Sequence, residues 1–427
     1  MVHVGVSITV VPVTSTLNRI MIADLHFSAL LVSFLIALPY LLSPLQVMMG
    51  NWTDRMTLWG QHRSPWIIIG GLMAAFGSYF TPHAVFLMTT QWLVGLCAAV
   101  GAFVLWGIGV NIASVSYLSL LSDLSEGNVG WRSRAVSVMW TAMILSTILT
   151  AATLSFLLDP YTPSALYTAF GAIWLVACLL ILIGATAIEP AATNQTHTIH
   201  HSATDPLAAL RLLIDNPTAR RFFFYLLIVL ISIHAQDVLL EPFGADALDM
   251  PVAQTSRLTS IWGIGVFLTL VGGLPLVRRM GKKRSANLGA FVTAAAFLCI
   301  IVTGLRNNVT LFQAAVLLLG LGGGLMTVSN LSFMLDMTVP QAAGLYMGAW
   351  GVANFAGQAL GNIVSGFLRD LLFRLTGDVI IGYVTVFGME VVGLLIAVWL
   401  FRTISVEEFR RHAELHLSDV MAVALDP

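Results

Sequence analysis

Residues 311–335 read LFQAAVLLLGLGGGLMTVSNLSFML, an apolar run without a charged side chain. A bilayer-spanning helix needs about 20 mostly apolar residues, so this stretch is long enough to cross a membrane. Residues 87–121 form a second run of this kind. Both runs are continuous, whereas the strands of an outer-membrane barrel are short and alternate between apolar and polar residues. The runs therefore predict membrane-spanning α-helices.

The composition of the whole chain extends this interpretation. Of the 427 residues, 58% are hydrophobic and 10% are charged, whereas a soluble domain carries about 25% charged residues. This apolar content is enough for about twelve spans. The formal net charge of -1 argues against a nucleic-acid partner. We therefore expect a polytopic membrane protein.

Turn residues and charges divide the apolar sequence into predicted spans. Six lie near residues 4–24, 28–49, 65–81, 87–121, 134–158 and 165–188, and six near 221–245, 258–277, 285–305, 311–335, 342–368 and 383–401. The segment between the two sets is polar and contains three histidines and three prolines. We predict an all-α membrane protein with four parts: an N-terminal six-helix bundle (1–188), a cytoplasmic linker (189–220), a C-terminal six-helix bundle (221–401) and a cytoplasmic tail (402–427).

The distribution of basic residues predicts the orientation, because Lys and Arg are retained on the cytoplasmic side of a membrane. Placing both termini inside assigns fifteen of the twenty basic residues to the cytoplasmic side. The other five are Arg19, Arg257, Arg306, Arg369 and Arg374. This bias predicts cytoplasmic termini.

The loops after the second and eighth predicted spans carry related patterns. The first contains Gly50, Asp54, Arg55, Gly60 and Arg63, and the second contains Gly273, Arg278, Arg279, Met280, Gly281, Lys282 and Lys283. Both resemble the G-x-x-x-D-R-x-G-R-K loop of the major facilitator superfamily, although the second has Arg278 where the acid belongs. Such a loop could bind a helix end, or it could serve only as a positive-inside anchor. The resemblance implies the facilitator fold, with two six-helix bundles facing each other.

Two carboxylates end the fourth and tenth predicted spans at matching places, Asp123 and Asp336. A carboxylate at a helix C-terminus is unfavourable unless a cation or the N-terminus of another helix interacts with it. For Asp123, the candidate interaction partners are Arg134 and the loop that carries Arg55 and Arg63. We interpret this group as gate or hinge contacts rather than ligand sites: Asp54, Arg55, Arg63, Asp123, Arg134 and Asp336.

The densest group of ionisable residues in an apolar span is HAQDVLLEP at 234–242. In one continuous helix, His234, Asp237 and Glu241 share a face. Ionisable groups inside a membrane helix are costly, which makes them functional candidates. At 1.5 Å per residue, Asp237 lies about 24 Å and Glu241 about 30 Å along the span, near the extracytoplasmic interface, where Glu241 is expected to be partly wet. Helix capping or pairing with Arg257 is the structural alternative, and proton coupling is a third interpretation.

Polar residues elsewhere in the spans are further candidates. Asn111 lies near the middle of the fourth span, where bonding to another helix is favoured over ligand binding. Asn354 and Gln358 share a face of the glycine-rich eleventh span, in which close packing is the default and a flat macrocycle is the alternative. The sequence assigns no role to Glu390.

Motifs for several other functions are missing from the sequence. No nucleotide-binding loop, Ser/His/Asp constellation or His/Glu metal motif is present, so we expect no ATP-driven transport, enzyme activity or metal site. Cys97, Cys178 and Cys299 lie in apolar runs without metal-ligand spacing. Residues 406–423 are interpreted as an interfacial amphipathic helix.

The run QDVLLEPFG at 236–244 resembles the PucC/LhaA family, the bacteriochlorophyll delivery family within the facilitator superfamily. Supporting resemblances are LNRIMI at 17–22, ALP at 37–39, RSPW at 63–66 and the glycine-rich segments 320–324 and 344–351. The similarity extends from residue 15 to residue 400. Ala245 and Asp246 depart from the small or glycine residues expected there, and this departure bears on the assignment to a subgroup more than on the assignment to the family.

The resemblance implies a role in assembling photosynthetic light-harvesting complexes in the bacterial inner membrane, cytoplasmic or photosynthetic. Its members are thought to bind or deliver (bacterio)chlorophyll or to hold antenna polypeptides. The candidate ligand-binding or functional residues are Gln236, Asp237, Glu241, His234, Asn111, Asn354 and Gln358. Candidate ring contacts are Trp106, Trp140, Trp262 and Trp350, and candidate axial ligands of the pigment magnesium are His234, Asn111 and His83. The pigment is expected as a ligand rather than a tightly bound cofactor.

Two other functions compete with pigment delivery. One is a proton-coupled secondary transporter that uses Asp237 or Glu241 as the proton carrier. The other is a scaffold that binds antenna polypeptides on its lipid-facing helices. Transporters place polar ligand partners near the membrane midplane, and this chain has few there, which favours pigment handling or scaffolding.

Overall fold

The computed structural model describes residues 1–46, 48–49, 52, 56, 58–125, 129–186, 216–339 and 343–412. The first half contains α1 (Val2–Ser7), η1 (Pro12–Leu17), η2 (Ile20–Asp24), α2 (Ala29–Leu41), α4 (Ser64–Thr90), α5 (Trp92–Leu124), α6 (Val129–Leu157) and α7 (Pro163–Ala185). The second half contains α9 (Pro217–His234), η3 (Ala235–Asp237), α10 (Leu240–Leu248), α11 (Val252–Met280), α12 (Lys282–Arg306), α13 (Val309–Asp336), α14 (Ala343–Thr376) and α15 (Val379–Arg402). The predicted all-α class is confirmed.

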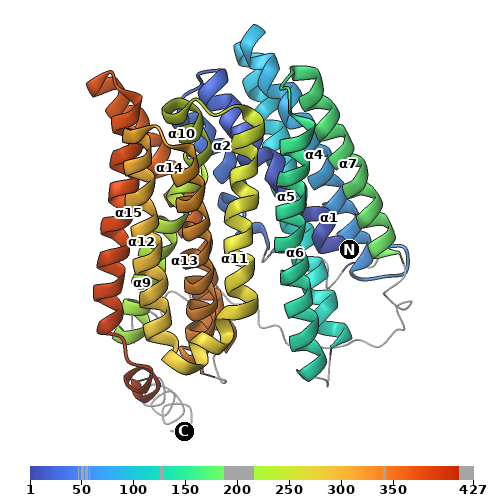
Figure 1. Cartoon of the computed structure of the whole chain (residues 1–427). Coiled ribbons are helices and arrows are strands. Elements are labelled where there is room, and N and C mark those ends of the chain that lie inside the picture. The colour runs from blue at the N-terminus through green and yellow to red at the C-terminus, as the bar shows by residue number, and fades with distance from the viewer. Residues whose placement is uncertain are drawn as a thin grey trace.

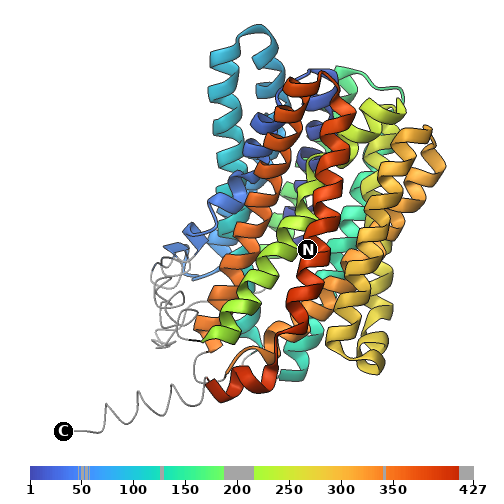
Figure 2. The ribbon, with the colours of Figure 1, turned by 90° about the vertical axis from the view of Figure 1, so that its left-hand side faces the viewer.

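The helices run roughly parallel to one long axis, as Figures 1 and 2 show from two sides. We call the end at which α11 and α15 begin, at Val252 and Val379, the head end. We call the end at which α9 begins and α15 ends, at Pro217 and Arg402, the tail end. The head end is at the top of Figure 1.

Helix termini are set by local side chains at several places. Asn216 accepts hydrogen bonds from the backbone N–H groups of Thr218 and Ala219 at the start of α9. Asn308 and Asp378 cap α13 and α15 in the same way. Each cap satisfies backbone donors that have no partner within the helix. These polar residues therefore mark where the apolar segments begin.

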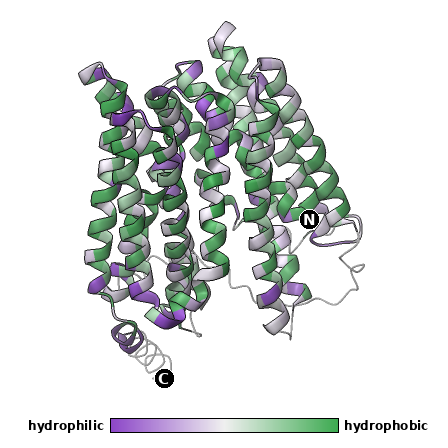
Figure 3. Cartoon of the chain, in the orientation of Figure 1, coloured by the Kyte–Doolittle hydropathy of each residue, from purple (hydrophilic) through white to green (hydrophobic). Residues whose placement is uncertain are grey.

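Most of the long helices are suited to a bilayer. Within the described residues, nine helical segments are long and apolar enough to cross a membrane, and Ala29–Leu41 is a shorter apolar helix. Two further helices, α4 and α14, contain 27 and 34 residues. Hydrophobic residues cover the middle of the helices in Figure 3, and hydrophilic residues gather toward the ends. The count of twelve spans stays a prediction, as do the boundaries of linker and tail, since 187–215 and 413–427 lie outside the described residues.

Two predicted spans differ from continuous α-helices. The first, predicted at 4–24, contains π-helical segments at Pro12–Leu17 and Ile20–Asp24. The seventh, predicted at 221–245, is interrupted after His234 by a short 3₁₀ turn before α10 begins. Such irregular turns within helices often occur at functional sites. The two interruptions are in contact, because the Asn18 side chain, between η1 and η2, donates a hydrogen bond to the Val238 carbonyl directly after the 3₁₀ turn.

The two halves are joined at the head end. There, α6 packs on α11 and α2 packs on α14. The Asp370 carboxylate of α14 accepts hydrogen bonds from the Ser28 hydroxyl at 2.6 Å and from the Ala29 backbone N–H at 3.1 Å. The Ser260 hydroxyl of α11 donates to the Ile148 carbonyl of α6 at 2.9 Å. A carboxylate at the N-terminus of α2 is favourable, so this contact stabilises the association.

Candidate functional site

The candidate site is the polar cluster at the break between α9 and α10, formed by His234, Gln236, Asp237 and Glu390. His234 is the last residue of α9, and Asp237 ends the 3₁₀ turn. The His234 Nδ1 lies 2.7 Å from Asp237 Oδ2, and the Gln236 amide donates to Asp237 Oδ1 at 2.5 Å. Both carboxylate oxygens of Asp237 are therefore held by neighbours in sequence.

Pro242 explains part of the break. It has no N–H to donate to the carbonyl of Val238, four residues earlier, and its ring crowds that carbonyl. Pro242 lies in the first turn of α10, where a proline is tolerated. The Val238 carbonyl instead accepts a 2.8 Å hydrogen bond from the buried amide of Asn18 in the first span. A neighbouring helix thus satisfies a backbone group that the proline leaves without its usual partner.

Glu241 does not share the environment that the sequence predicted. The expectation of a continuous polar stripe is wrong, because the break separates Glu241 from His234 and Asp237. Its carboxylate is 5% exposed rather than wet. It accepts a 2.8 Å hydrogen bond from the Thr259 hydroxyl of α11, instead of pairing with the exposed Arg257. Glu241 therefore connects α10 to α11.

The Glu241 contact continues into the first half of the chain. The Thr259 hydroxyl lies 2.8 Å from the hydroxyl of Ser15. One turn away, Thr16 and Ser256 form a second hydroxyl pair at 2.9 Å. Buried hydroxyl groups need partners in an apolar interior, and these pairs supply them across the two halves.

Glu390 is the residue to which the sequence assigned no role. It lies on α15 and is 1% exposed. Within the described part of the chain, neither of its side-chain oxygens has a hydrogen bond. The nearby polar groups are the Gln236 backbone and the Asp237 carboxylate, which interacts with it electrostatically. An acid buried in this way is costly, and it lies next to the break, so we include it in the site.

The three amide candidates outside the cluster, Asn111, Asn354 and Gln358, form hydrogen bonds between or within helices. Asn111 donates to the Pro39 carbonyl at 2.9 Å and accepts from the Gln46 amide, so it bonds α5 to the segment that begins with α2. This is the helix-to-helix role that the sequence favoured. Gln358 donates to Asn354 on the same face of α14. The structure places α14 against η3, and therefore near the candidate site.

The contacts at the tail end match between the halves. Arg63, before α4, donates to Asp123 at the end of α5 at 3.2 Å. Lys282, at the start of α12, donates to Asp336 at the end of α13 at 2.6 Å. Asp123 thus pairs with Arg63, one of its predicted interaction partners, whereas Arg134 is exposed on α6. Asp54 and Arg55 lie outside the described residues.

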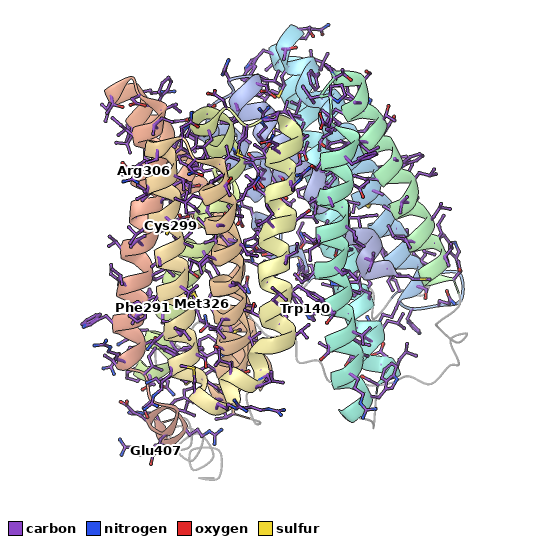
Figure 4. The ribbon with its side chains drawn as sticks, viewed as in Figure 1. Trp140, Phe291, Cys299, Arg306, Met326 and Glu407 are labelled. Carbon is purple, nitrogen blue, oxygen red and sulfur yellow. The ribbon has the colours of Figure 1, made fainter. Side chains whose placement is uncertain are left out.

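The candidate pigment contacts differ in accessibility. Trp350 is fully buried, and Trp106 is buried with its indole N–H 3.3 Å from the Thr9 hydroxyl. Trp262 is half-buried against the core. Trp140 is 48% exposed and projects from α6 on the side of α11 in Figure 4. His83 is exposed, with its Nδ1 3.0 Å from the Tyr79 carbonyl. In the part of the chain described, no group of three metal-binding side chains occurs.

These features define a polytopic helical membrane protein with the fold of the major facilitator superfamily. A crystal structure of the nucleoside transporter NupG aligns with a TM-score of 0.73 over 95% of this chain and 100% of that chain, at 14% identity. The chain belongs to the PucC protein family, whose sequence profile matches residues 16–409. The predicted family and fold are confirmed.

Two relatives in Rhodobacter capsulatus match over most of their length. The protein PucC is 28% identical over 417 residues, which cover 93% of this chain and 89% of the relative. A protein named bacteriochlorophyll synthase 44.5 kDa chain is 29% identical over 405 residues, which cover 93% of this chain and 92% of the relative. The match therefore includes both halves of the fold and the broken seventh span.

Proposed function

We propose that this protein assists the assembly of photosynthetic light-harvesting complexes in the bacterial inner membrane, with both termini in the cytoplasm. It binds or delivers (bacterio)chlorophyll, holds antenna polypeptides, or does both, and it has no enzyme activity and no tightly bound cofactor. The observation that carries the proposal is the family match over residues 16–409, which contains the broken span and its polar cluster.

His234 is the residue we assign to the pigment. Its Nδ1 donates to the Asp237 carboxylate, and this tautomer leaves the lone pair on Nε2. Histidines that bind metals commonly donate their other ring N–H to a carboxylate, which orients the ring and raises its basicity. The His234 side chain is 25% exposed, so it is accessible to a ligand. We propose that Nε2 is the axial ligand of the magnesium in a bound (bacterio)chlorophyll.

The other residues of the cluster support this role. Gln236 donates to the second oxygen of Asp237, which keeps the carboxylate in place for His234. The Asn18 amide holds the Val238 carbonyl, and so holds the backbone directly after the turn that carries Gln236 and Asp237. Exposed apolar residues on the outer helices provide a surface for lipids and for antenna helices.

The test is an absorption spectrum and pigment extraction on protein purified gently from its native membrane. We expect stoichiometric (bacterio)chlorophyll, lost in Asp237→Asn. In the cell, Asp237→Asn and Glu241→Gln are expected to lower antenna assembly at normal protein abundance. The matched control is Glu407→Gln, because Glu407 is an exposed acid at the tail end (Figure 4). Reduced abundance of Asp237→Asn and Glu241→Gln would instead assign the two acids to stability alone.

Proton-coupled secondary transport is the alternative function. It is favoured by the buried carboxyl of Glu390 beside Asp237, because buried acids in membrane proteins often serve as proton carriers. The same purification separates the functions. A colourless protein that retains antenna polypeptides supports the scaffold. A colourless protein without them makes transport the leading function.

A further inference from the structure

A cavity of about 600 Å³ lies between the two halves at the head end, away from the polar cluster. It is lined by Ala152, Ser155, Phe156, Leu157, Asp159 and Arg257. The first four belong to the last turns of α6, Asp159 follows that helix, and Arg257 lies in the second turn of α11. The volume is within the range of small-ligand sites, about 300–1,000 Å³. A molecule bound here contacts both halves.

Two oppositely charged side chains, Arg257 and Asp159, line the cavity. Arg257 and Asp159 are both exposed, and the ion pairs formed within the described ranges do not include a pair between them. Each charge can therefore bind a ligand group of the opposite sign. The cavity thus presents a separate cation site and anion site.

The cavity also contains an unused hydroxyl group and an apolar wall. Ser155 is 4% exposed, and its hydroxyl has no hydrogen-bond partner within the described part of the chain. Phe156 is 81% exposed and lies in the last turn of α6, where a helix long enough to cross the bilayer reaches the interfacial region. The charges are thus placed at the depth of lipid head groups, with an apolar surface beside them.

We propose that this cavity binds the head group of a zwitterionic phospholipid with a primary amine. The phosphate accepts charge-assisted hydrogen bonds from Arg257 and a hydrogen bond from Ser155, and the ammonium donates to Asp159. The start of an acyl chain packs along Phe156 and Ala152. An anionic lipid satisfies Arg257 but leaves Asp159 without a cation. A choline head group carries the positive charge but has no N–H to donate.

Binding has a conformational consequence. The lipid contacts α6 of one half and α11 of the other, and these helices pack together at the head end. A ligand stabilises the conformation that it binds more tightly. The bound lipid therefore favours the arrangement in which the head end is closed.

The test is native mass spectrometry of the delipidated full-length protein with phosphatidylethanolamine, phosphatidylglycerol or phosphatidylcholine added separately. We expect phosphatidylethanolamine to bind most tightly. Arg257→Gln is expected to weaken its binding by about fivefold or more, the loss of one charge-assisted contact. Asp159→Asn is expected to abolish the preference over phosphatidylglycerol. Arg306→Gln is the control, because Arg306 is an exposed arginine of the same end outside the cavity (Figure 4).

Several outcomes would overturn the proposal. Equal binding of the three lipids would mean nonspecific lipid contact, and tighter binding of phosphatidylglycerol would assign the cavity to an anionic lipid. An equal loss of phosphatidylethanolamine binding in Arg257→Gln and Arg306→Gln would show that the cavity is not the binding site. Arg257 and Asp159 are exposed, so both variants are expected to fold, and matching thermal unfolding curves would verify this.

Discussion

Asn18 in the first span and Val238 in the seventh are joined by a 2.8 Å hydrogen bond from the Asn18 amide to the Val238 carbonyl. Four residues after Val238, Pro242 removes the helical donor that would otherwise bind this carbonyl. A side chain of the first half therefore supplies the hydrogen bond that the interrupted helix of the second half lacks. This relationship couples the geometry of the candidate site to the association of the halves.

Asn18→Leu is expected to lower the free energy of unfolding by about 1 kcal/mol, a typical magnitude for a hydrogen bond between membrane helices. Leucine has the same branching at Cγ but cannot donate to the Val238 carbonyl. The measurement is thermal or denaturant unfolding of the purified protein in detergent. Thr327→Val is the control, because the Thr327 hydroxyl donates to the Gly323 carbonyl of its own helix and, among the described residues, to no other helix. An equal effect of both variants would contradict a special role for Asn18.

His234→Gly is expected to abolish (bacterio)chlorophyll binding, and added imidazole is expected to restore it. The reason is that the substitution removes the proposed axial nitrogen and leaves space that a free imidazole can occupy. Pigment bound to the purified protein, measured by its absorption spectrum, is the readout. His83→Gly should retain the pigment, because His83 lies at the exposed surface of α4. Normal pigment content in His234→Gly would show that His234 is not the ligand of the pigment magnesium.

The two tail-end ion pairs are expected to differ in their contribution to stability. The Arg63 side chain is 5% exposed, whereas the Lys282 side chain is 38% exposed. Exposed ion pairs contribute about 0–1 kcal/mol, and charges removed from water interact more strongly. Asp123→Asn should therefore lower the unfolding free energy more than Asp336→Asn, as measured by denaturant titration. The reverse order would show that burial of Arg63 does not determine the strength of its pair.

The fold could be predicted from the sequence because a membrane restricts which structures a chain can adopt within it. Uncharged runs such as 311–335 predict helices, since backbone polar groups have no other partners in lipid. The observed α13, Val309–Asp336, differs from that run by two residues at one end and one at the other. Helical pairing between the halves depends instead on side-chain packing, which hydropathy does not encode.

Only part of the candidate site could be predicted from the sequence. The sequence identified His234, Gln236 and Asp237 because polar residues are unusual in an apolar span. The prediction for Glu241 was wrong, because the shared face requires a continuous helix and the chain is interrupted between His234 and α10. The sequence also left Glu390 unassigned, since its neighbour Asp237 is more than 150 positions away in the chain. Contacts of this kind arise from tertiary packing and have no local signature.

Gly366→Ile is expected to separate α2 from α14 at the head end. A Cβ atom at Gly366 would lie 2.0 Å from the Ser33 hydroxyl oxygen and 2.5 Å from the Ala29 carbonyl oxygen, which requires the helices to move apart. The measurement is disulfide cross-linking between cysteines placed at Ser28 and Asp370, which are hydrogen-bonded in the structure. The cross-linked fraction should fall. Gly388→Ile is the control, because a Cβ atom there meets nothing within 4 Å, and equal cross-linking in both variants would contradict the prediction.

The two opposite ends of the molecule report the orientation of the chain in the membrane. Arg306 lies near the head end and Glu407 at the tail end in Figure 4, and both are exposed. If basic residues are retained on the cytoplasmic side, a cysteine at 407 is labelled from the cytoplasm and a cysteine at 306 from the opposite side. The measurement uses a membrane-impermeant thiol reagent on intact cells and on inverted vesicles, with Cys97, Cys178 and Cys299 replaced by alanine. Labelling of position 407 in intact cells would overturn cytoplasmic termini and place the candidate site nearer to the cytoplasmic face.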